Sequence, residues 1–490
     1  LSRGLGDVYK RQVLSPLSDR TTSVKSPSSP PLVLRESQQV ALAKLCEPGR
    51  TYAALWAEPR SGKTAVCLRW LEHLKPKVVV IVGPKIAEQV WRTEASKWFT
   101  TQYQFYPLTV GNDYPSVQEF RHMTLLFVNY EQFDKVPFKR LSPYLRALSK
   151  RANGQGAMIL DESHMIKSPS SIRGRHIRPL AEQWKYRLIV TGTPVTNPGQ
   201  VDAIYGQWTF LNPQIRERWR TARDFREYFG EWTTYRGYPE LVRPIRQYEM
   251  HVYIQPDVVT MAGPKHHLRT IRVDYPLPEE VRSKLRTMER DGVVQLCGHM
   301  ILGLYPMTRL LRMRTLVAGW AKDDKGIPVT YHPALNRRLQ VLQWLFCKKG
   351  LGKTIICCTH LEEIRLLTTY MDRHLRLSYR VIQGSTKQKN EVLQEFQQGT
   401  VHVLIVQPRT VSMAVDISAA SNLIWYSSDF NYVTYKQASD RIKLSPQKPK
   451  VWFLCGRGSV DMDVWITLEE DHTHLEKTIA RIKPRNYLLT

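Results

Sequence analysis

Short apolar runs followed by stretches with helical spacing recur in two series along the chain, and they constrain its fold more than any other feature. The first series comprises VVVIVGP (78–84), LLFVNY (125–130), MILDE (158–162) and RLIVTGTP (187–194). The second series comprises TIICCTH (354–360), YRVIQG (379–384), VHVLIVQP (401–408), NLIWYSS (422–428) and VWFLCG (451–456). Apolar strands that alternate with helices are typical of parallel sheets covered on both faces. The pattern therefore predicts an α/β chain with two parallel-sheet domains.

The length of 490 residues is sufficient for two such domains. We expect the first domain at residues 32–213 and the second at residues 336–490. The strand pattern lapses over residues 214–275, where basic and aromatic residues are interleaved. We therefore interpret this segment as a largely helical insertion, and we assign residues 214–335 to the helical insertion and linker between the domains.

The first 31 residues are expected to lie outside both domains. Residues 1–12 include DVYKRQ, which is similar to the translation of a transposon adapter from sequencing libraries, and we exclude them from the fold. Residues 13–31 are rich in Ser and Pro, which predicts a flexible lead-in.

The charge balance favours a polyanionic partner. Lys and Arg number 71 against 44 Asp and Glu, which gives a formal net charge of +27 and an isoelectric point near 9.8. Nucleic acid is the leading candidate, because basic side chains release its condensed counterions, although a ribosome-associated protein or a binder of anionic lipid would have the same balance.

No run approaches the ~20 apolar residues that a membrane helix needs. We therefore expect no membrane partner.

The seven cysteines indicate a reducing compartment. They form no CxxC pair and have no nearby histidine cluster at zinc-binding spacing. Cys357 and Cys358 lie inside an apolar run, so we expect them to be buried core thiols.

A phosphate-binding loop is predicted at AEPRSGKT (57–64). This segment follows the apolar TYAALW and precedes AVCLRWLEHL, whose spacing suits a helix, and strand, loop and helix in that order are what the loop requires. Lys63 would reach the β- and γ-phosphates of a nucleotide, and Thr64 would bind Mg²⁺. The predicted nucleotide-binding residues of the loop are Arg60, Ser61, Gly62, Lys63 and Thr64. A second GKT, in KGLGKT (349–354), runs directly into the strand-like IICC, so we expect no nucleotide there.

Two carboxylates end the apolar run MIL about 100 residues after the loop. Asp161 can hold Mg²⁺ through water, and Glu162 can orient the water that attacks the phosphate. An acidic turn at a solvated edge would look the same in isolation, but its distance from the loop favours a hydrolytic site.

Several other motifs occur in a characteristic order. They are LRESQQ (34–39), DESH (161–164), TGTPVTN (191–197), GST (384–386), SAAS (418–421) and QASDRI (437–442). From about Leu34 to Trp465 the chain resembles the Swi/Snf family of superfamily 2 helicase-like ATPases, in the style of short phage or prokaryotic members. This resemblance implies a location in the bacterial cytoplasm or in that of a phage-infected host. The resemblance implies two RecA-like lobes that close around ATP and Mg²⁺, and a monomer that binds nucleic acid, foremost double-stranded DNA.

The resemblance also implies roles for matching residues. Gln38 would contact adenine, and His164 would couple hydrolysis to Gln437. The residues implied in catalysis are Asp161, Glu162, His164 and Arg441. The motif that relays the nucleotide state to nucleic acid comprises Thr191, Gly192 and Thr193. PKIAEQVWRTEASKW (84–98) is similar to the segment that lines the nucleic-acid track, and LLRMRTLVAG (310–319) is similar to the helix before the second lobe.

Two motifs depart from the family pattern. The positions that fit the sixth motif, Gln-x-x-x-Arg-x-x-Arg-x-x-Gln, are Gln437, Arg441 and Gln447. Leu444 stands where the family's transition-state arginine is expected, and such arginines contribute roughly 10³–10⁵ in rate. Lys443 and Lys448 are nearby, but an ammonium cannot make the bidentate contact of guanidinium. The fifth motif, TVSMAVDIS (410–418), lacks the glycines expected near its start.

The basic and aromatic segment is a candidate nucleic-acid contact. Its proposed contact residues are Arg216, Arg218, Arg220 and Arg223. Its aromatic residues could stack on bases, or they could form a small helical core with the arginines extended outward.

Three functions remain open from the sequence. The resemblance favours an ATP-dependent translocase on duplex DNA, with a strand-separating DNA or RNA helicase as the nearest enzyme alternative. A nucleotide-gated DNA clamp with little turnover is the third, because Leu444 replaces the expected arginine.

Overall fold

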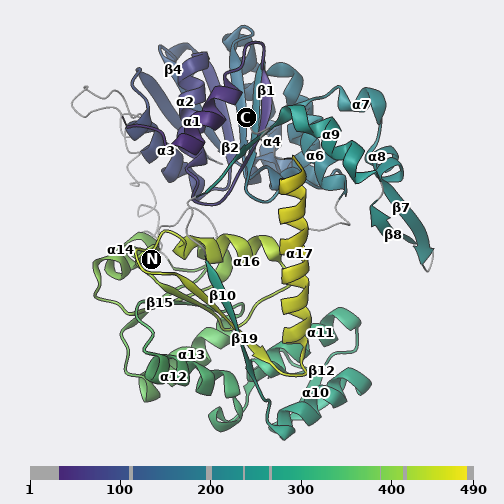
Figure 1. Ribbon diagram of the computed structural model, residues 1–490, viewed down its shortest axis with the longest axis vertical. Coiled ribbons are helices and arrows are strands. Elements are labelled where there is room, and N and C mark those ends of the chain that lie inside the picture. Colours follow the sequence, from purple (N-terminus) through teal and green to yellow (C-terminus); the bar gives the residue numbers. More distant parts are fainter. Residues whose placement is uncertain are drawn as a thin grey trace, which may run out of the picture. The chain divides into compact units, whose positions relative to one another are not determined.

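The computed structural model describes residues 32–109, 114–194, 201–235, 238–244, 246–263, 268–386, 388–411 and 417–482. The chain divides into two compact units, with the main division between Met261 and Ala262. Each unit is built on its own parallel sheet, which confirms the predicted α/β class with two RecA-like sheets (Figure 1).

Unit 1 contains a seven-stranded parallel sheet with the strand order β3-β4-β2-β5-β6-β1-β9. Its strands are β1 (Tyr52–Ala57), β2 (Val78–Gly83), β3 (Tyr103–Leu108), β4 (Met123–Asn129), β5 (Gly156–Asp161), β6 (Tyr186–Thr191) and β9 (Val258–Met261). Alternate residues such as Val79 and Ile81 belong to the core beneath α1, α2 and α3, while Val80 and Val82 on the opposite face are equally buried. Because both faces of the sheet are buried, these strands have continuous apolar sequences.

Helices follow most strands of unit 1. They are α1 (Glu36–Leu45), α2 (Lys63–Leu74), α3 (Ala87–Trp98), α4 (Lys135–Ala152), α5 (Ile172–Ile177), α6 (Val201–Leu211), α7 (Ile215–Arg218), α8 (Ala222–Phe229) and α9 (Gln247–Ile254). The antiparallel hairpin of β7 (Gly230–Tyr235) and β8 (Tyr238–Pro244) extends from this set. Because all strands of the sheet are parallel, their carboxyl ends lie at one edge, where the predicted motifs of unit 1 come together.

Unit 2 contains a six-stranded parallel sheet with the strand order β10-β19-β18-β15-β17-β16. Its strands are β10 (Arg269–Tyr275), β15 (Thr354–Cys357), β16 (Tyr379–Ile382), β17 (Val403–Val406), β18 (Asn422–Trp425) and β19 (Lys450–Gly456). Cys357 and Cys358 are buried in it, as predicted, and burial raises the pKa of both thiols.

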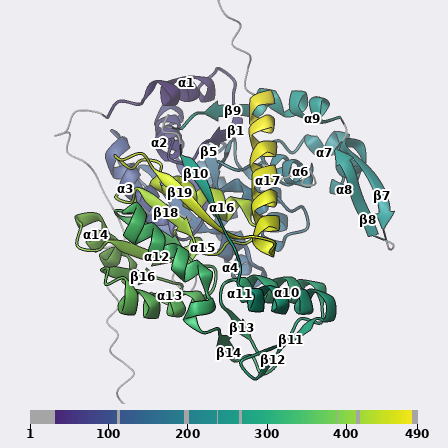
Figure 2. The same ribbon diagram turned by 60° about the horizontal axis from the view of Figure 1, so that its bottom comes forward.

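The helices of unit 2 cover its sheet, and a small subdomain adjoins it. The helices are α10 (Glu279–Asp291), α11 (Pro306–Val317), α12 (Arg337–Lys349), α13 (Leu361–His374), α14 (Lys389–Gln398), α15 (Pro408–Val411), α16 (Tyr432–Ser439) and α17 (Val460–Ile482). Two short antiparallel hairpins are formed by β11 (Val293–Leu296) with β12 (His299–Leu302), and by β13 (Trp320–Lys322) with β14 (Pro328–Thr330). Figure 2 shows these hairpins grouped with α10 and α11, and all share one hydrophobic core with α12 and α13.

The segment at residues 214–275 differs from the largely helical interpretation. It contains α7, α8 and α9, but also the hairpin β7–β8 and strands β9 and β10. Strand β9 pairs with β1 in the first sheet, and β10 pairs with β19 in the second. The main division between the units therefore falls inside the segment that was expected to separate them. Among the described residues, no helix combines the length and apolar character of a membrane span.

Candidate active site

A tight loop joins β1 to α2 and has the strand, loop and helix order that the sequence predicts. Gly62 has a φ of 79°, and a Cβ at this position would lie 2.3 Å from Nε2 of Gln38, so the loop requires glycine there. Arg60 also has a positive φ, of 62°. The first N–H groups of a helix have no intrahelical acceptor, so the start of α2 at Lys63 is suited to bind phosphate.

Gln38 ties the start of α1 to this loop. Its Nε2 donates to the Gly62 carbonyl oxygen at 3.4 Å, and its Oε1 accepts from the Arg35 amide at 2.8 Å. The side chain is buried against the predicted phosphate site. This position is compatible with the implied adenine contact, which stays a prediction.

Lys63 lies between the two predicted carboxylates. Its Nζ lies 2.5 Å from Glu162 Oε1 and 3.5 Å from Asp161 Oδ1. The three residues are close because β1 and β5 end at the same edge of the parallel sheet. Lys63 and Glu162 remain about one-fifth exposed, so the pair is accessible to a ligand.

Glu162 adopts a left-handed backbone conformation, with a φ of 54°. Such conformations cost free energy in residues other than glycine and cluster at functional sites. Burial opposes ionisation of Glu162, but the charge of Lys63 and contacts with His164 outweigh it and lower the pKa of the carboxyl well below its usual range. Glu162 is therefore ionised at neutral pH, as a residue that orients water requires.

Asp161 has a carboxylate oxygen suited to a Mg²⁺ site. Oδ1 is buried and faces Lys63, and among the described residues it has no hydrogen-bond partner. Oδ2 accepts a hydrogen bond from the Trp91 indole at 3.0 Å. No group of three or more His, Cys, Asp or Glu in the described part of the chain could hold a metal. A single carboxylate next to a phosphate loop fits Mg²⁺, which retains several waters and takes further ligands from phosphate.

Hydrogen bonds connect the carboxylates to the TGT motif. His164 Nδ1 lies 3.2 Å from Thr191 Oγ1 and 3.4 Å from Glu162 Oε2. Thr191 Oγ1 also accepts from the Thr193 amide at 3.1 Å. The structure thus brings His164, Thr191 and Thr193, with Gly192 between them, into one group with the predicted hydrolytic residues.

A second connection runs through Gln207, which the sequence analysis did not identify. The Ser163 hydroxyl donates to Gln207 Oε1 at 2.7 Å, and Gln207 Nε2 donates to the carbonyls of Pro194 and Ala203 at 3.0 and 2.9 Å. Gln207 is fully buried on α6. The only sequence signal is one amide residue within the apolar stretch AIYGQWTFL.

The close packing of α6 against the DESH segment depends on Gly206. A Cβ at Gly206 would lie 2.2 Å from the carbonyl oxygen of Lys167, so a larger residue would displace the helix. Gln207 therefore sits on an element that is held directly against residues 163–167.

The sixth-motif residues lie in unit 2. Gln437 is on α16, and Arg441 is in the short 3-10 helix Asp440–Ile442 that follows it. Leu444 is 39% exposed, so the side chain at this position has room to be longer. Their contact with a nucleotide bound at Lys63 stays a prediction, and residues 412–416 of the fifth motif lie outside the described residues.

The second GKT has no loop-to-helix geometry. Lys353 immediately precedes strand β15, and its Nζ donates to the carbonyl of Phe396 and lies 5.0 Å from the Phe396 ring centroid. This arrangement agrees with the expectation that Lys63 is the nucleotide lysine.

A cavity of ≈ 410 Å³ lies at the carboxyl ends of the unit 2 strands. The residues that line it include Thr359, Gly384, Gln407 and Asp429. Gly384 belongs to the GST motif, and its amide donates to Gln407 Oε1 at 3.1 Å. Ligands of open parallel sheets commonly bind at this edge, so the cavity is a candidate contact region in unit 2.

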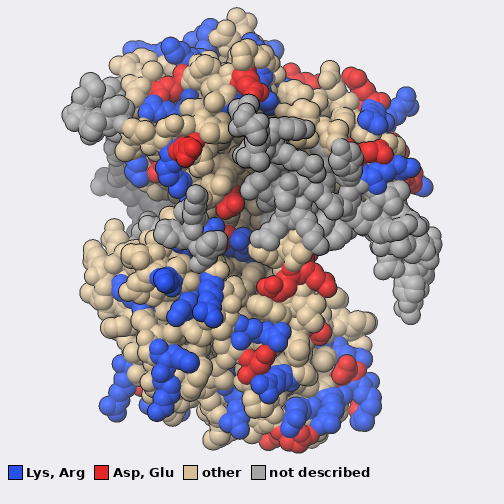
Figure 3. All heavy atoms as spheres, viewed as in Figure 1, with Lys and Arg blue, Asp and Glu red and all other residues tan. Residues whose placement is uncertain are grey.

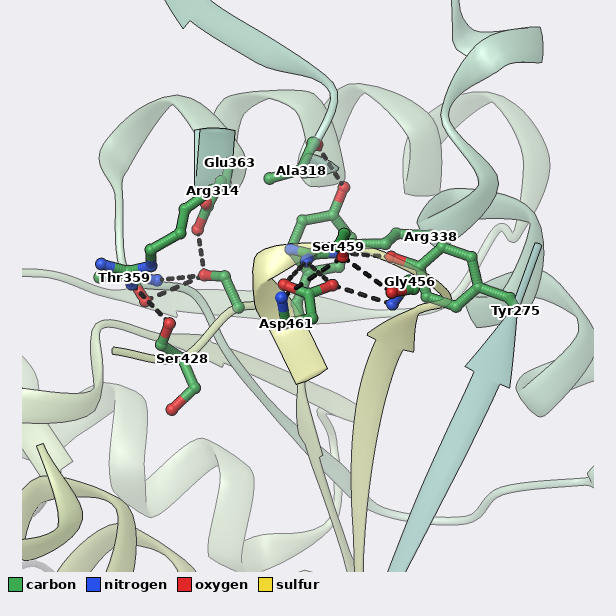
Figure 4. Close-up of polar contacts among 12 residues, drawn as sticks. Tyr275, Arg314, Ala318, Arg338, Thr359, Glu363, Ser428, Gly456, Ser459 and Asp461 are labelled. Atoms are coloured by element: carbon green, nitrogen blue, oxygen red, sulfur yellow. Dashed lines mark hydrogen bonds and ion pairs between the residues drawn. The ribbon is translucent and has the colours of Figure 1, made fainter. Parts of the chain in front are cut away.

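A buried ion pair joins the start of α17 to the core of unit 2 (Figure 4). Arg338 on α12 donates to Asp461 Oδ1 and Oδ2 at 2.6 and 2.5 Å, and to the Tyr275 hydroxyl at 2.6 Å. Asp461 also accepts from the Gly456 amide at 2.9 Å. Burial opposes the charge of Arg338, but Asp461 outweighs it and raises the arginine pKa well above its usual value. No motif in the sequence indicated this pair.

The candidate nucleic-acid segment has a small aromatic core. Trp219, Phe225 and Phe229 are buried, and the Trp219 ring centroid lies 5.1 Å from each of the two phenylalanine rings. Arg218 is exposed and lies over Trp219 at 4.7 Å. Arg220 and Arg223 are also exposed, whereas Arg216 is half-buried. The buried rings are therefore unavailable to bases, while contact of the arginines with phosphate stays a prediction.

Two protein-family models match the chain. The SNF2-related domain matches residues 20–258, and the helicase conserved C-terminal domain matches residues 337–443. The chain belongs to the Swi/Snf-type superfamily 2 helicase-like ATPases. This confirms the family that the order of motifs indicated.

Similar proteins agree with this family. The chain is 22% identical over 475 residues to the ISWI chromatin-remodeling complex ATPase ISW1 of Saccharomyces cerevisiae. This alignment covers 88% of this chain and 40% of the relative. It is 22% identical to the human DNA annealing helicase and endonuclease ZRANB3, covering 79% of this chain and 35% of the relative. It is 22% identical to the human DNA repair and recombination protein RAD54B, and that alignment covers 82% of this chain and 49% of the relative. The chain thus spans less than half the length of these relatives.

A solved structure also resembles the chain. This structure is the SWI2/SNF2 ATPase core of Sulfolobus solfataricus in complex with double-stranded DNA. The superposition covers 91% of this chain and 97% of the Sulfolobus chain, with 16% sequence identity and a TM-score of 0.39.

Proposed function

We propose that this chain is a nucleic-acid-dependent ATPase that uses ATP hydrolysis to move along duplex DNA. The contact of Lys63 with Asp161 and Glu162, and the link from these residues to Thr191, carry the proposal. A phosphate-binding lysine, a metal carboxylate and an ionised carboxylate that orients water are the groups that phosphoryl transfer to water requires. Membership of the family supports the same activity.

Each residue of the cluster has a distinct task in this proposal. Lys63 binds the β- and γ-phosphates, and the ionised Glu162 orients the attacking water. Thr64 and Asp161 hold Mg²⁺, largely through water, and Mg²⁺ supplies neutralising charge to the phosphates when it is bound. His164 contacts both Glu162 and Thr191, so it can transmit a change at the carboxylate to the TGT motif.

Duplex DNA is the proposed track because of charge and family. Figure 3 shows basic side chains on the surface of each unit, with acidic ones among them, and the formal net charge is +27. The exposed Arg218, Arg220 and Arg223 are proposed phosphate contacts of unit 1. Contacts of this kind give affinity with little sequence specificity and a strong dependence on salt. A monomer is the proposed assembly.

The proposal is tested by steady-state ATP hydrolysis without nucleic acid and with duplex DNA, single-stranded DNA or RNA. We expect stimulation by duplex DNA that is lost in Lys63→Ala and in Glu162→Gln. Stronger stimulation by single strands or RNA would instead support a strand-separating helicase.

A nucleotide-gated clamp is a second candidate, because Leu444 is exposed where the family pattern expects an arginine. Tight ATP binding to the wild-type chain, with no phosphate release above that of Glu162→Gln, would favour the clamp over the translocase.

A further inference from the structure

Trp91 makes a direct contact with the proposed metal carboxylate. It lies on α3, and its side chain is 1% exposed within the core of unit 1. The indole Nε1 donates to Asp161 Oδ2 at 3.0 Å. The contact forms because α3 follows β2 and Asp161 ends β5, and these strands are neighbours in the sheet.

The two carboxylate oxygens of Asp161 have different surroundings. Oδ2 is held by the indole, while Oδ1 faces Lys63 Nζ at 3.5 Å and has no hydrogen-bond partner among the described residues. The backbone carbonyl of Asp161 accepts from the buried Tyr130 hydroxyl at 2.9 Å. The residue is therefore held at its backbone and at one oxygen, which leaves only Oδ1 toward the nucleotide loop.

Trp70 provides a comparison within the same core. It is also 1% exposed, and its indole donates to the backbone carbonyl of Leu45 at 3.1 Å. Both indoles are thus buried and hydrogen-bonded, but only that of Trp91 acts on a group of the candidate site. A hydrogen bond from a neutral donor to a carboxylate is also stronger than one to a neutral carbonyl.

We propose that Trp91 is a positioning residue that directs Oδ1 of Asp161 toward the Mg²⁺–nucleotide complex by holding Oδ2. The inference rests on the proposed ATPase function, because it concerns the metal of that reaction. Without the indole N–H, Oδ2 is buried and unsatisfied, and the carboxylate can rotate away from the geometry that favours the metal.

The test is equilibrium binding of a fluorescent ADP analogue to the full chain as Mg²⁺ is titrated, with parallel measurements in EDTA. Trp91→Phe removes the donor and keeps an aromatic ring, and Trp70→Phe is its matched control. Asp161→Asn marks the full loss of the metal carboxylate. Groups that orient metal ligands typically contribute 10–100-fold in metal affinity, so Trp91→Phe should raise the Mg²⁺ concentration at half-saturation by about tenfold. Binding in EDTA should be unchanged.

The outcomes separate the inference from the function on which it rests. Equal Mg²⁺ titrations for Trp91→Phe and Trp70→Phe would overturn the role of Trp91 and leave the nucleotide site intact. A wild-type chain that does not bind the ADP analogue would overturn the nucleotide site itself. A wild-type chain that binds the analogue equally with Mg²⁺ and with EDTA would overturn the Mg²⁺ site, and with it the role of Trp91. Thermal unfolding checks whether Trp91→Phe is folded. If it is not, 3-benzothienylalanine at position 91 keeps the shape of the indole without its N–H, and the same tenfold shift in the Mg²⁺ concentration at half-saturation is expected.

Discussion

The tripeptide GKT occurs in both units and has different surroundings in each. In unit 1 its glycine ends the loop and its lysine begins α2, where Lys63 contacts Glu162 and Asp161. In unit 2 it precedes β15, and Lys353 contacts the carbonyl and ring of Phe396. We expect the same three residues to bind phosphate only where a glycine turn leads into a helix N-terminus. The element that follows the motif therefore determines its chemistry.

The ion pairs of the two units show a second difference. The side chains of Lys63 and Glu162 are 21% and 20% exposed, whereas those of Arg338 and Asp461 are 1% and 11% exposed. A partly exposed pair can exchange one partner for a ligand. A buried pair that loses a partner leaves an uncompensated charge, so its partners stay together. We therefore expect the first pair to serve catalysis and the second to serve stability.

The largest expected effect is a loss of ATP hydrolysis that distinguishes the two GKT lysines. Lys63→Ala should lower ATP hydrolysis by about 10²–10³-fold, because one group that stabilises phosphate charge is removed. Lys353→Ala should leave hydrolysis near the wild-type rate. Steady-state phosphate release measures both variants, and an equal loss in Lys353→Ala would remove the distinction between the two motifs.

A large effect on stability is expected at the buried pair. Asp461→Asn should lower the free energy of unfolding of unit 2 by about 3–5 kcal/mol, because Arg338 stays charged and buried. Glu279→Gln is the control, since Glu279 forms exposed ion pairs with Arg282 at 2.8 Å and with Arg286, and exposed pairs contribute about 0–1 kcal/mol each. Urea unfolding measures the difference, and similar midpoints for the two variants would contradict the structural role.

A smaller effect is expected at Gln207. Gln207→Leu leaves the Ser163 hydroxyl and the Pro194 carbonyl without their partner, which should cost about 1–3 kcal/mol in stability. We also expect nucleic acid to stimulate hydrolysis less, while ATP binding persists, because one connection between the DESH and TGT motifs is lost.

Thr209→Val is the control for Gln207→Leu, because it removes only a buried hydrogen bond to Gly206 within α6. The ratio of stimulated to basal hydrolysis separates the two variants. If both lose the same share of stimulation, Gln207 only stabilises the helix.

The smallest effect is expected at position 444. Leu444→Arg should raise the rate of ATP hydrolysis by about tenfold. This is below the 10³–10⁵-fold rate contribution of established arginine fingers, because the residues around position 444 do not orient an arginine toward the phosphate. Leu444→Met keeps a long uncharged side chain and should have no effect. A rate unchanged by Leu444→Arg would indicate that Arg441 or a lysine already supplies the charge.

Most of the fold was predictable because the inner strands are buried on both faces. Continuous apolar runs such as Val78–Gly83 and Asn422–Trp425 mark strands of this kind directly. Three sheet strands were not identified: β3, β9 and β10 lie at sheet edges, and β10, with the sequence RTIRVDY, is only partly buried. An edge strand needs less apolar surface, so its sequence can resemble that of a loop. The edge strand β16 was nevertheless predicted, from YRVIQG (379–384).

The sequence by itself determined the two parallel sheets, the phosphate loop and the order of the motifs, because each depends on residues that are adjacent in the chain. Only the tertiary structure decided which distant side chains meet: Trp91 with Asp161, Ser163 with Gln207, and Arg338 with Asp461. These pairs are 44 to 123 residues apart in sequence. Their contacts arise from the crossovers of parallel strands and from helix packing, which no local pattern of residues records.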